Sequence, residues 1–433
     1  MPRVLHRIRA DLRDPLLRNG YALLANVGLT SLLGFGYWII AARLYPPEYL
    51  GLGTATIALM QLLAGIAGQP SIANALTRFI PRAGGRSVRL AAVAYGAAAV
   101  IGVTVSALYI AAASLPLGLP KLLGTGWTSG VILAGAVMTW CVFSLQDAVL
   151  TGIRQAVWLP LENGVYGLAK IGLLVALAPV AMQYGIVASW IVPALVIVVP
   201  VNLFIFCVLL PRHAKSSRAE PGRQSARTVA RFVGGDYLGS VFALMTVDLM
   251  PLLVVARLGA VDTGFFSIPF LIIYSLELVT VNLGVALTVE GAMDRPRLRH
   301  NVLLVLRRVA LLVLPAVAVL LAVPGLVLSL FGENYAENSS TLLRLLALGV
   351  VPKAVTSLYF SLARVERKVS RIAAIEALRL VLLLGSAWWL MGEFGLAGVG
   401  IAYLATQSVV AVVLVPRIVR LVREPARNSQ PAM

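Results

Sequence analysis

Two stretches of sequence half a chain length apart share one pattern: Ala41–Ala55 reads AARLYPPEYLGLGTA, and Val255–Pro269 reads VARLGAVDTGFFSIP. In each stretch an apolar segment ends in Ala-Arg-Leu, and a short turn with one acid follows, Glu48 or Asp262. A glycine then comes before the next apolar segment. If each half of the chain holds an even number of membrane spans, both copies enter the membrane in the same direction. The repeat therefore predicts two parallel halves related by an axis along the membrane normal.

The composition requires a lipid environment. Of the 433 residues, 59% are hydrophobic and only 12% are charged, whereas about 25% are charged in a soluble domain. Backbone polar groups in hydrocarbon must be paired within the chain, so the spans are expected to be helices. We predict an all-α polytopic membrane protein with about 12 transmembrane helices, each about 20 residues long. They are expected near residues 21–42, 50–70, 90–113, 128–150, 160–180, 186–210, 231–256, 263–290, 303–330, 341–362, 371–391 and 396–416.

The placement of the basic residues predicts the orientation. The net charge is +18, and most Lys and Arg residues fall in segments that share one side of the membrane. Only Arg43, Lys121 and Arg257 fall in the predicted outer loops. The positive-inside rule then places both termini in the cytoplasm, so the charge does not indicate nucleic-acid binding. The basic residues are almost all Arg, which is typical of a GC-rich genome and suggests a bacterium.

These spans and charges predict the domain organisation. We expect a cytoplasmic basic segment at 1–20, an N-lobe of helices 1–6 at 21–210, a cytoplasmic linker at 211–230, a C-lobe of helices 7–12 at 231–416, and a cytoplasmic tail at 417–433. The linker is the clearest polar break, and we expect it to lie near anionic lipid headgroups.

Polar side chains inside spans are candidate functional residues, because they are costly in a bilayer unless they are paired or hydrated. The candidates on the first two predicted helices and on helices 7, 8 and 10 are Asn26, Gln69, Asn74, Arg78, Asp236, Asp248, Glu277, Asn282 and Lys353. Two more pairs are expected to be structural. Glu376 and Arg379 are spaced i, i+3 on one helix and are expected to pair. Asp147 and Glu162 flank a loop that contains Arg154, where a local ion-pair cluster is expected.

The region from Leu33 to Pro81 resembles the start of polysaccharide-export flippases. Its core reads GFGYWIIAARLYPPEYLGLGTATIALMQLLAGIAGQPSIANALTRFIP. These O-antigen and lipid-linked oligosaccharide transporters belong to the multidrug/oligosaccharidyl-lipid/polysaccharide (MOP) exporter superfamily. The second copy, with Asp262-Thr263-Gly264-Phe265-Phe266, resembles the junction between the seventh and eighth helices of the same family.

The resemblance implies two six-helix lobes packed as a V around a central cavity that helices 1, 2, 7 and 8 line. It implies a transporter that flips a glycan on a polyprenyl phosphate-type lipid across the cytoplasmic membrane by alternating access. Lipopolysaccharide or exopolysaccharide export is the implied pathway, with membrane lipids and a glycan polymerase or glycosyltransferase as implied partners. No enzymatic activity, metal or cofactor is expected.

Each candidate residue keeps two interpretations. Arg78 is either a phosphate ligand or a basic anchor at the membrane edge. Asn26, Gln69, Asn74 and Asn282 either bind sugar hydroxyls or bond neighbouring helices. The acids Asp236, Asp248 and Glu277 are candidates for proton or sodium coupling, whereas Asp248 and Glu277 are also candidates for ion pairs with Lys353 or Lys170. Lys353 is thus either a residue of the substrate cavity or a partner of these acids.

Three other classes are weaker fits. A cation-coupled drug or metabolite antiporter of the same superfamily often carries an acid in the first helix, and residues 21–42 contain none. A major-facilitator transporter usually has an Asp in the loop that here reads TRFIPRAGGRSVR. A membrane glycosyltransferase or polymerase would use paired acids or a His near the outer face, whereas all three His residues fall on the predicted inner side.

Overall fold

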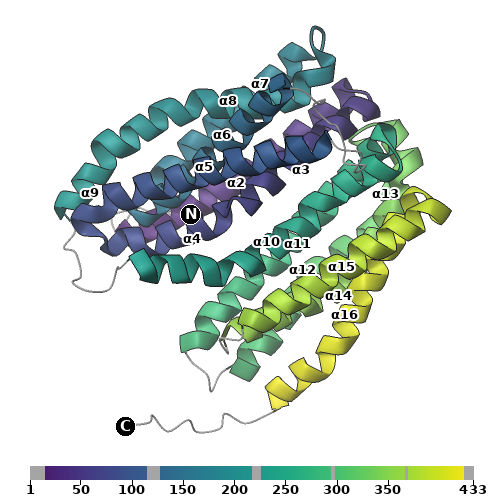
Figure 1. The fold of residues 1–433 in the computed structure, drawn as a ribbon. Coiled ribbons are helices and arrows are strands. Elements are labelled where there is room, and N and C mark those ends of the chain that lie inside the picture. The colour runs from purple at the N-terminus through teal and green to yellow at the C-terminus, as the bar shows by residue number, and fades with distance from the viewer. Residues whose placement is uncertain (1–14, 115–126, 217–225, 294–297, 366–368, 424–433) are drawn as a thin grey trace, which may run out of the picture. The chain divides into compact units, whose positions relative to one another are not determined.

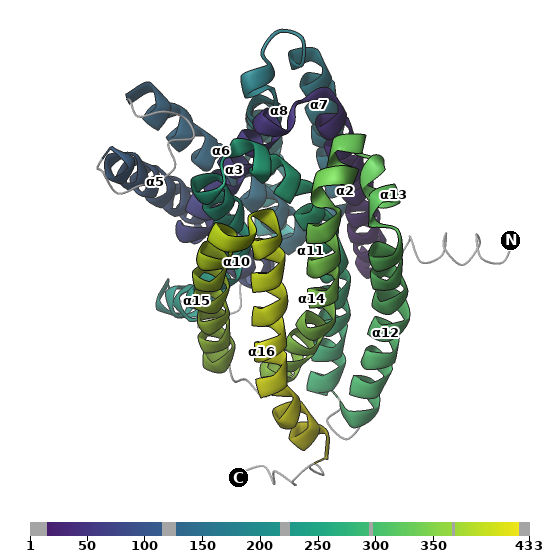
Figure 2. The same cartoon turned by 90° about the vertical axis from the view of Figure 1, so that its right-hand side faces the viewer.

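The computed structural model describes residues 15–114, 127–216, 226–293, 298–365 and 369–423, and every regular element within these ranges is helical. The helices form two compact units, Met1–Leu244 and Met245–Met433 (Figures 1 and 2). The boundary between the units falls inside one helix, α10 (Ala226–Arg257). Most of the predicted basic segment at 1–20 and of the tail at 417–433, and half of the linker at 211–230, lie outside the described residues.

Unit 1 contains eight helices and the first part of α10. They are α2 (Pro15–Leu44), α3 (Pro47–Ile66), α4 (Gln69–Phe79), α5 (Ser87–Ala113), α6 (Trp127–Gly152), α7 (Leu159–Leu177), α8 (Met182–Phe204) and α9 (Leu210–Ser216). A π-helix, Ile205–Leu209, joins α8 to α9. Unit 2 contains the rest of α10 with α11 (Ala260–Met293), α12 (Leu298–Ala322), α13 (Pro324–Ser329), α14 (Glu333–Val365), α15 (Val369–Phe394) and α16 (Leu396–Arg423).

Eleven helices within the described ranges are long and apolar enough to span a membrane. The one predicted span that is not among these eleven, near 160–180, corresponds to α7. This segment is helical but less apolar, because it carries Glu162, Asn163 and Lys170. These three side chains are buried inside unit 1 rather than exposed toward lipid. The expected number of spans is therefore consistent with the helices, and α7 buries its polar side chains against neighbouring helices.

The second predicted helix is divided. α3 ends at Ile66 and α4 begins at Gln69, so Gln69, Asn74 and Arg78 lie on a separate helix rather than on the inner end of α3. The division lies at Gly68, which has a left-handed φ of 84°. Pro70 in the first turn of α4 explains the break, because its ring removes a donor and cannot follow an uninterrupted helix. The predicted span 303–330 is divided in the same way, at Pro324.

The repeated sequence forms similar junctions in both units. α2 ends at Leu44 and α3 begins at Pro47, while α10 ends at Arg257 and α11 begins at Ala260. The first turn is fixed by Tyr45, whose hydroxyl donates to the Leu174 carbonyl at 2.7 Å, and burial raises the pKa of this phenol. In the second turn Gly259 takes a φ of 93°. The local part of the repeat prediction is confirmed.

Small residues allow close helix contacts in both units. In unit 1, a Cβ at Gly164 or Gly167 on α7 would lie 2.9 or 2.7 Å from Leu29 or Leu33 on α2. In unit 2, α14 packs against both α11 and α16, and a Cβ at Gly400 would lie 2.6 Å from Leu345. These glycines let the polar side chains of neighbouring helices reach one another inside each unit.

Candidate functional site

Lys170 is buried in unit 1 inside a cage of aromatic rings. Its Nζ lies 4.2 Å from the Trp190 ring centroid, 4.4 Å from Tyr37 and 5.4 Å from Tyr166. The rings come from α8, α2 and α7, so three helices converge on one ammonium group. Within the described residues Lys170 has no carboxylate within ion-pair distance. Within the described residues, cation–π contacts with these three rings are therefore the interactions that stabilise the ammonium charge.

A chain of polar side chains lies elsewhere in unit 1, between α6, α7 and α8. The Gln146 side-chain amide donates to Glu162, and Asn202 donates to Gln146 Oε1 at 2.8 Å. The three side chains come from α6, α7 and α8 respectively. The Gln146 amide thus satisfies one oxygen of this buried acid, while the other oxygen of Glu162 has no hydrogen-bond partner in the described residues.

The same helices join Asp147 to a candidate residue on α2. The Asn163 side-chain amide donates to Asp147 Oδ2 and to Asn26 Oδ1, each at 3.3 Å. Asn26 therefore bonds to a neighbouring helix, which is one of the two interpretations of this residue. The expected ion pairs with Arg154 do not form in the described structure, because Arg154 is exposed in the α6–α7 connection, whereas Asp147 and Glu162 point into the helix contacts.

Three further candidates of unit 1 meet where α4 packs against the start of α10. Asn74 donates to Asp236 Oδ2 at 2.9 Å, and Ser240 donates to the same oxygen at 3.2 Å. Arg78 lies over the Phe232 ring, 4.7 Å from its centroid. Asp236 is thus an acceptor in a hydrogen-bonded contact between helices, a role that the sequence alone did not predict. Gln69 is half-buried at the first position of α4.

Unit 2 contains a buried charged cluster around Glu277 of α11. Lys353 of α14 lies 4.0 Å from Glu277, and the two side chains are 12% and 15% exposed. Tyr403 of α16 donates a hydrogen bond to the same carboxylate. The predicted pairing of Glu277 with Lys353 is therefore present. Three helices meet at this carboxylate, and Gly349 gives the Tyr403 ring room, because a Cβ there would overlap it.

A second pair on α15 borders this cluster. Arg379 and Glu376 form the predicted i, i+3 ion pair at 2.5 Å, with both side chains less than 10% exposed. Their charges act on Lys353, so Glu277, Lys353, Glu376 and Arg379 form one electrostatic group. With two acids and two bases, the group is neutral overall, which reduces the cost of burying it.

Asp248 on α10 has a different environment from Glu277. Its side chain is 4% exposed, and Oδ2 has no hydrogen-bond partner in the described part of the chain. No Lys or Arg of the described residues lies within ion-pair distance of it. Among the candidate acids, Asp248 therefore receives the least stabilisation of its charge from the described side chains. Asn282, further along α11, has an exposed side chain.

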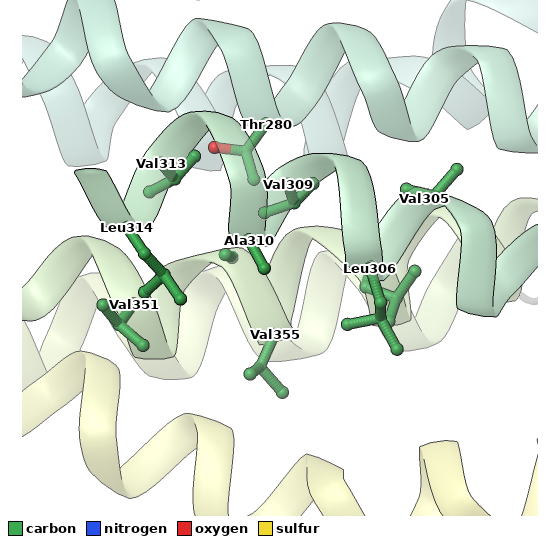
Figure 3. A pocket seen from close by; sticks show the side chains of 11 residues that line it. Thr280, Val305, Leu306, Val309, Ala310, Val313, Leu314, Val351 and Val355 are labelled. Carbon is green, nitrogen blue, oxygen red and sulfur yellow. The ribbon is translucent and has the colours of Figure 1, made fainter. Parts of the chain in front are cut away.

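A cavity of about 180 Å³ in unit 2 contrasts with these polar groups. Aliphatic side chains of α12 and α14, with Thr280 of α11, line it (Figure 3). Thr280 Oγ1 is buried there without a hydrogen-bond partner in the described residues. This one hydroxyl among aliphatic side chains cannot replace the hydration of a phosphate or a glycan, so the cavity is not a candidate headgroup site.

Sequence reasoning missed the cage and the amide chain. The sequence indicates Lys170 only as a partner for acids, because aromatic residues on separate helices carry no shared signal along the chain. Gln146, Asn163, Asn202 and Tyr403 could have been included by applying the rule for polar residues in spans more widely.

No family model matches the chain. A curated protein of Shigella flexneri, described as a "Putative O-antigen transporter", is 30% identical over 149 residues. The match covers 34% of this chain and 36% of that relative, so the chain matches about a third of the relative's length.

Solved structures resemble nearly the whole chain. An inward-facing multidrug resistance MATE family transporter of the MOP superfamily has a TM-score of 0.72 at 15% identity, covering 93% of this chain and 99% of that one. A MOP superfamily transporter from Pyrococcus furiosus has a TM-score of 0.64 at 14% identity, covering 95% and 96%. The predicted fold class is confirmed by these matches. The chain is a multi-pass membrane protein with the fold of the MOP transporter superfamily, and the resemblance that its two repeated junctions predicted is confirmed.

Proposed function

We propose that the protein flips a lipid-linked oligosaccharide or polysaccharide precursor across the cytoplasmic membrane by alternating access. The observation that carries this proposal is the 30% identity over 149 residues to the Shigella flexneri protein described as a "Putative O-antigen transporter", on a fold shared with MOP superfamily transporters. The relatives are transporters, which supports a role without enzymatic activity. The domains proposed are the N-lobe at 21–210 and the C-lobe at 231–416, joined by the linker at 211–230.

The charges inside unit 1 support an anionic substrate. Lys170 is a buried cation with aromatic contacts and no carboxylate partner in the described residues, so a phosphate or pyrophosphate would supply the missing negative charge. Asn26, Gln69 and Asn74 remain proposed contacts for sugar hydroxyls, and Arg78 for phosphate. A glycan attached to a polyprenyl phosphate carrier contains both a phosphate and sugar hydroxyls in one molecule.

We further propose that the chain resides in a bacterial cytoplasmic membrane with both termini in the cytoplasm. The concentration of Arg on one predicted side supports this orientation. Glycosyltransferases or a glycan polymerase are proposed partners, because they would supply and use the lipid-linked substrate.

A cation-coupled antiporter of the same superfamily is the second candidate function. The likeness to multidrug resistance MATE structures favours it, while the absence of an acid from α2 disfavours it. Asp248 bears on both candidates, because a buried carboxylate without a described partner can take up a proton or sodium ion. Glu277, already paired with Lys353, is the less available of the two acids.

Deletion of the gene, followed by identification of lipid-linked intermediates, tests the flippase proposal. We expect a lipid-linked glycan to accumulate on the inner leaflet and wild-type protein to clear it. Increased drug sensitivity with unchanged glycolipids would reject the flippase in favour of the antiporter.

The coupling proposal is tested by Asp248→Asn in the complemented strain. Removing this buried charge should leave melting temperature unchanged or higher, while export falls. Glu277→Gln should also reduce export, but with a loss of stability. The exposed Glu393→Gln is the matched control, and normal export by both Asp248→Asn and Glu277→Gln would remove these acids as coupling sites.

A further inference from the structure

A pocket of about 390 Å³ lies in unit 1, between the α6–α7 connection and α9. Its polar lining includes Gln155, Arg212, His213 and Ser216, and its apolar lining includes Trp158 and Phe204. The volume lies within the roughly 300–1,000 Å³ typical of small-molecule sites. No Asp or Glu lines the pocket, so the charge that the described side chains present there is positive.

Two unusual backbone features build this pocket. The α6–α7 connection turns at Arg154, a non-glycine residue with a φ of 59°, and Gln155 follows with its N–H bonded to the Leu150 carbonyl at 2.8 Å. On the other side, the π-helix Ile205–Leu209 precedes α9, which continues from the end of α8 (Figure 1). A π-helix shifts the face that the following residues present, and such segments are frequent at functional sites. Here the shifted residues are Arg212 and His213.

The two walls of the pocket match two parts of an amphipathic ligand. Trp158 packs edge-on against Phe204, with ring centroids 5.2 Å apart, and forms an apolar wall. Opposite, the His213 ring is oriented by its Nε2 at 3.2 Å from the Ile80 carbonyl. Arg212 is exposed and has no carboxylate within ion-pair distance in the described residues. Its guanidinium group is free to bind a phosphate through two parallel hydrogen bonds.

The position in the chain places this pocket at a membrane surface. α6 forms one candidate span, and α8 begins another that runs through the π-helix and α9 to Ser216. The pocket lies at the ends of both spans, where α9 is polar. Tryptophan side chains are enriched at this depth, where lipid headgroups meet acyl chains. A soluble anion would gain nothing from the Trp158–Phe204 wall, whereas a lipid would contact both walls.

We propose that this pocket binds the headgroup of an anionic glycerophospholipid, with the phosphodiester on Arg212 and the glycerol and upper acyl chain against Trp158 and Phe204. The site is independent of the proposed transport function. Its ligand is a resident membrane lipid rather than the transported substrate.

Native mass spectrometry of the full chain in detergent tests the proposal. Phosphatidylglycerol and phosphatidylcholine with identical acyl chains are added at equal concentrations, and the fraction of protein carrying each lipid is measured. We expect preferential binding of phosphatidylglycerol, and about a fivefold loss of that binding in Arg212→Gln, as expected for about 1 kcal/mol per basic residue at an anionic surface.

Lys215→Gln is the matched control, because Lys215 is an exposed cation on the same helix but does not line the pocket. It should retain phosphatidylglycerol binding. Ser216→Glu, which places a negative charge at the exposed rim, is a second test and should also weaken binding. Equal losses in Arg212→Gln and Lys215→Gln would overturn the proposal, as would displacement of the lipid by an equal concentration of inorganic phosphate.

Discussion

The Glu277–Lys353 pair allows a quantitative test of the charged cluster in unit 2. The two groups are 4.0 Å apart, and both side chains are mostly buried. Coulomb's law gives an attraction of about 4 kcal/mol at this distance for an effective dielectric constant of about 20. The nearby Glu376 and Arg379 compete for the same partners and reduce this value. We therefore expect a coupling free energy of about 2–4 kcal/mol.

The perturbation is a double-mutant cycle of Glu277→Gln and Lys353→Met. Each single change leaves the other charge buried and unpaired, which is expected to cost about 3–5 kcal/mol. The double variant should therefore be less destabilised than the sum of the two singles. The free energy of unfolding is measured for purified protein in mixed micelles with a denaturing detergent, followed by tryptophan fluorescence.

The exposed Glu393 provides the control cycle. Glu393→Gln combined with Lys353→Met should be additive, because Glu393 is not an ion-pair partner of Lys353. A coupling free energy below about 0.5 kcal/mol between Glu277 and Lys353 would lie within the additivity expected for independent sites. That result would refute the expectation that the Glu277–Lys353 pair stabilises the contact between α11 and α14.

Three more predictions use the same unfolding measurement. Gly68→Ala should lower the free energy of unfolding by about 1 kcal/mol or more, because the φ of 84° at Gly68 strains any residue with a Cβ. The control Gly172→Ala lies in a helix with open space around it and should be neutral or stabilising. Equal effects of the two changes would contradict this reasoning. Gly349→Ala should displace Tyr403 from Glu277 and lower the free energy of unfolding by at least about 1 kcal/mol. Adding Tyr403→Phe to this variant should cause little further loss of stability, and full additivity of the two changes would contradict the prediction. Lys170→Met should fold with equal or higher stability yet lose glycan export, and normal export would remove Lys170 from the proposed substrate path.

The location of the helices could be read from the sequence because the bilayer imposes a length and an apolar composition on every span. The two Ala-Arg-Leu junctions also indicated helix–turn–helix units that the structure contains. The break in the second helix could have been found from the neighbouring Gly68 and Pro70, which together favour a turn. Pairs on one helix, such as Glu376 and Arg379, follow directly from helical periodicity.

Contacts between helices were decided by the tertiary structure. Lys170 meets rings from three helices, Glu277 meets Lys353 and Tyr403 from two others, and Asn74 meets Asp236 at a sequence separation of 162 residues. Hydropathy indicates how deep a residue lies in the membrane, but it does not indicate the direction in which the residue faces around the helix axis. That direction depends on which neighbours pack closely, and here small residues such as Gly167 and Gly349 set those distances. The sequence alone thus determined which polar groups enter the membrane, while packing between the helices determined which of them meet.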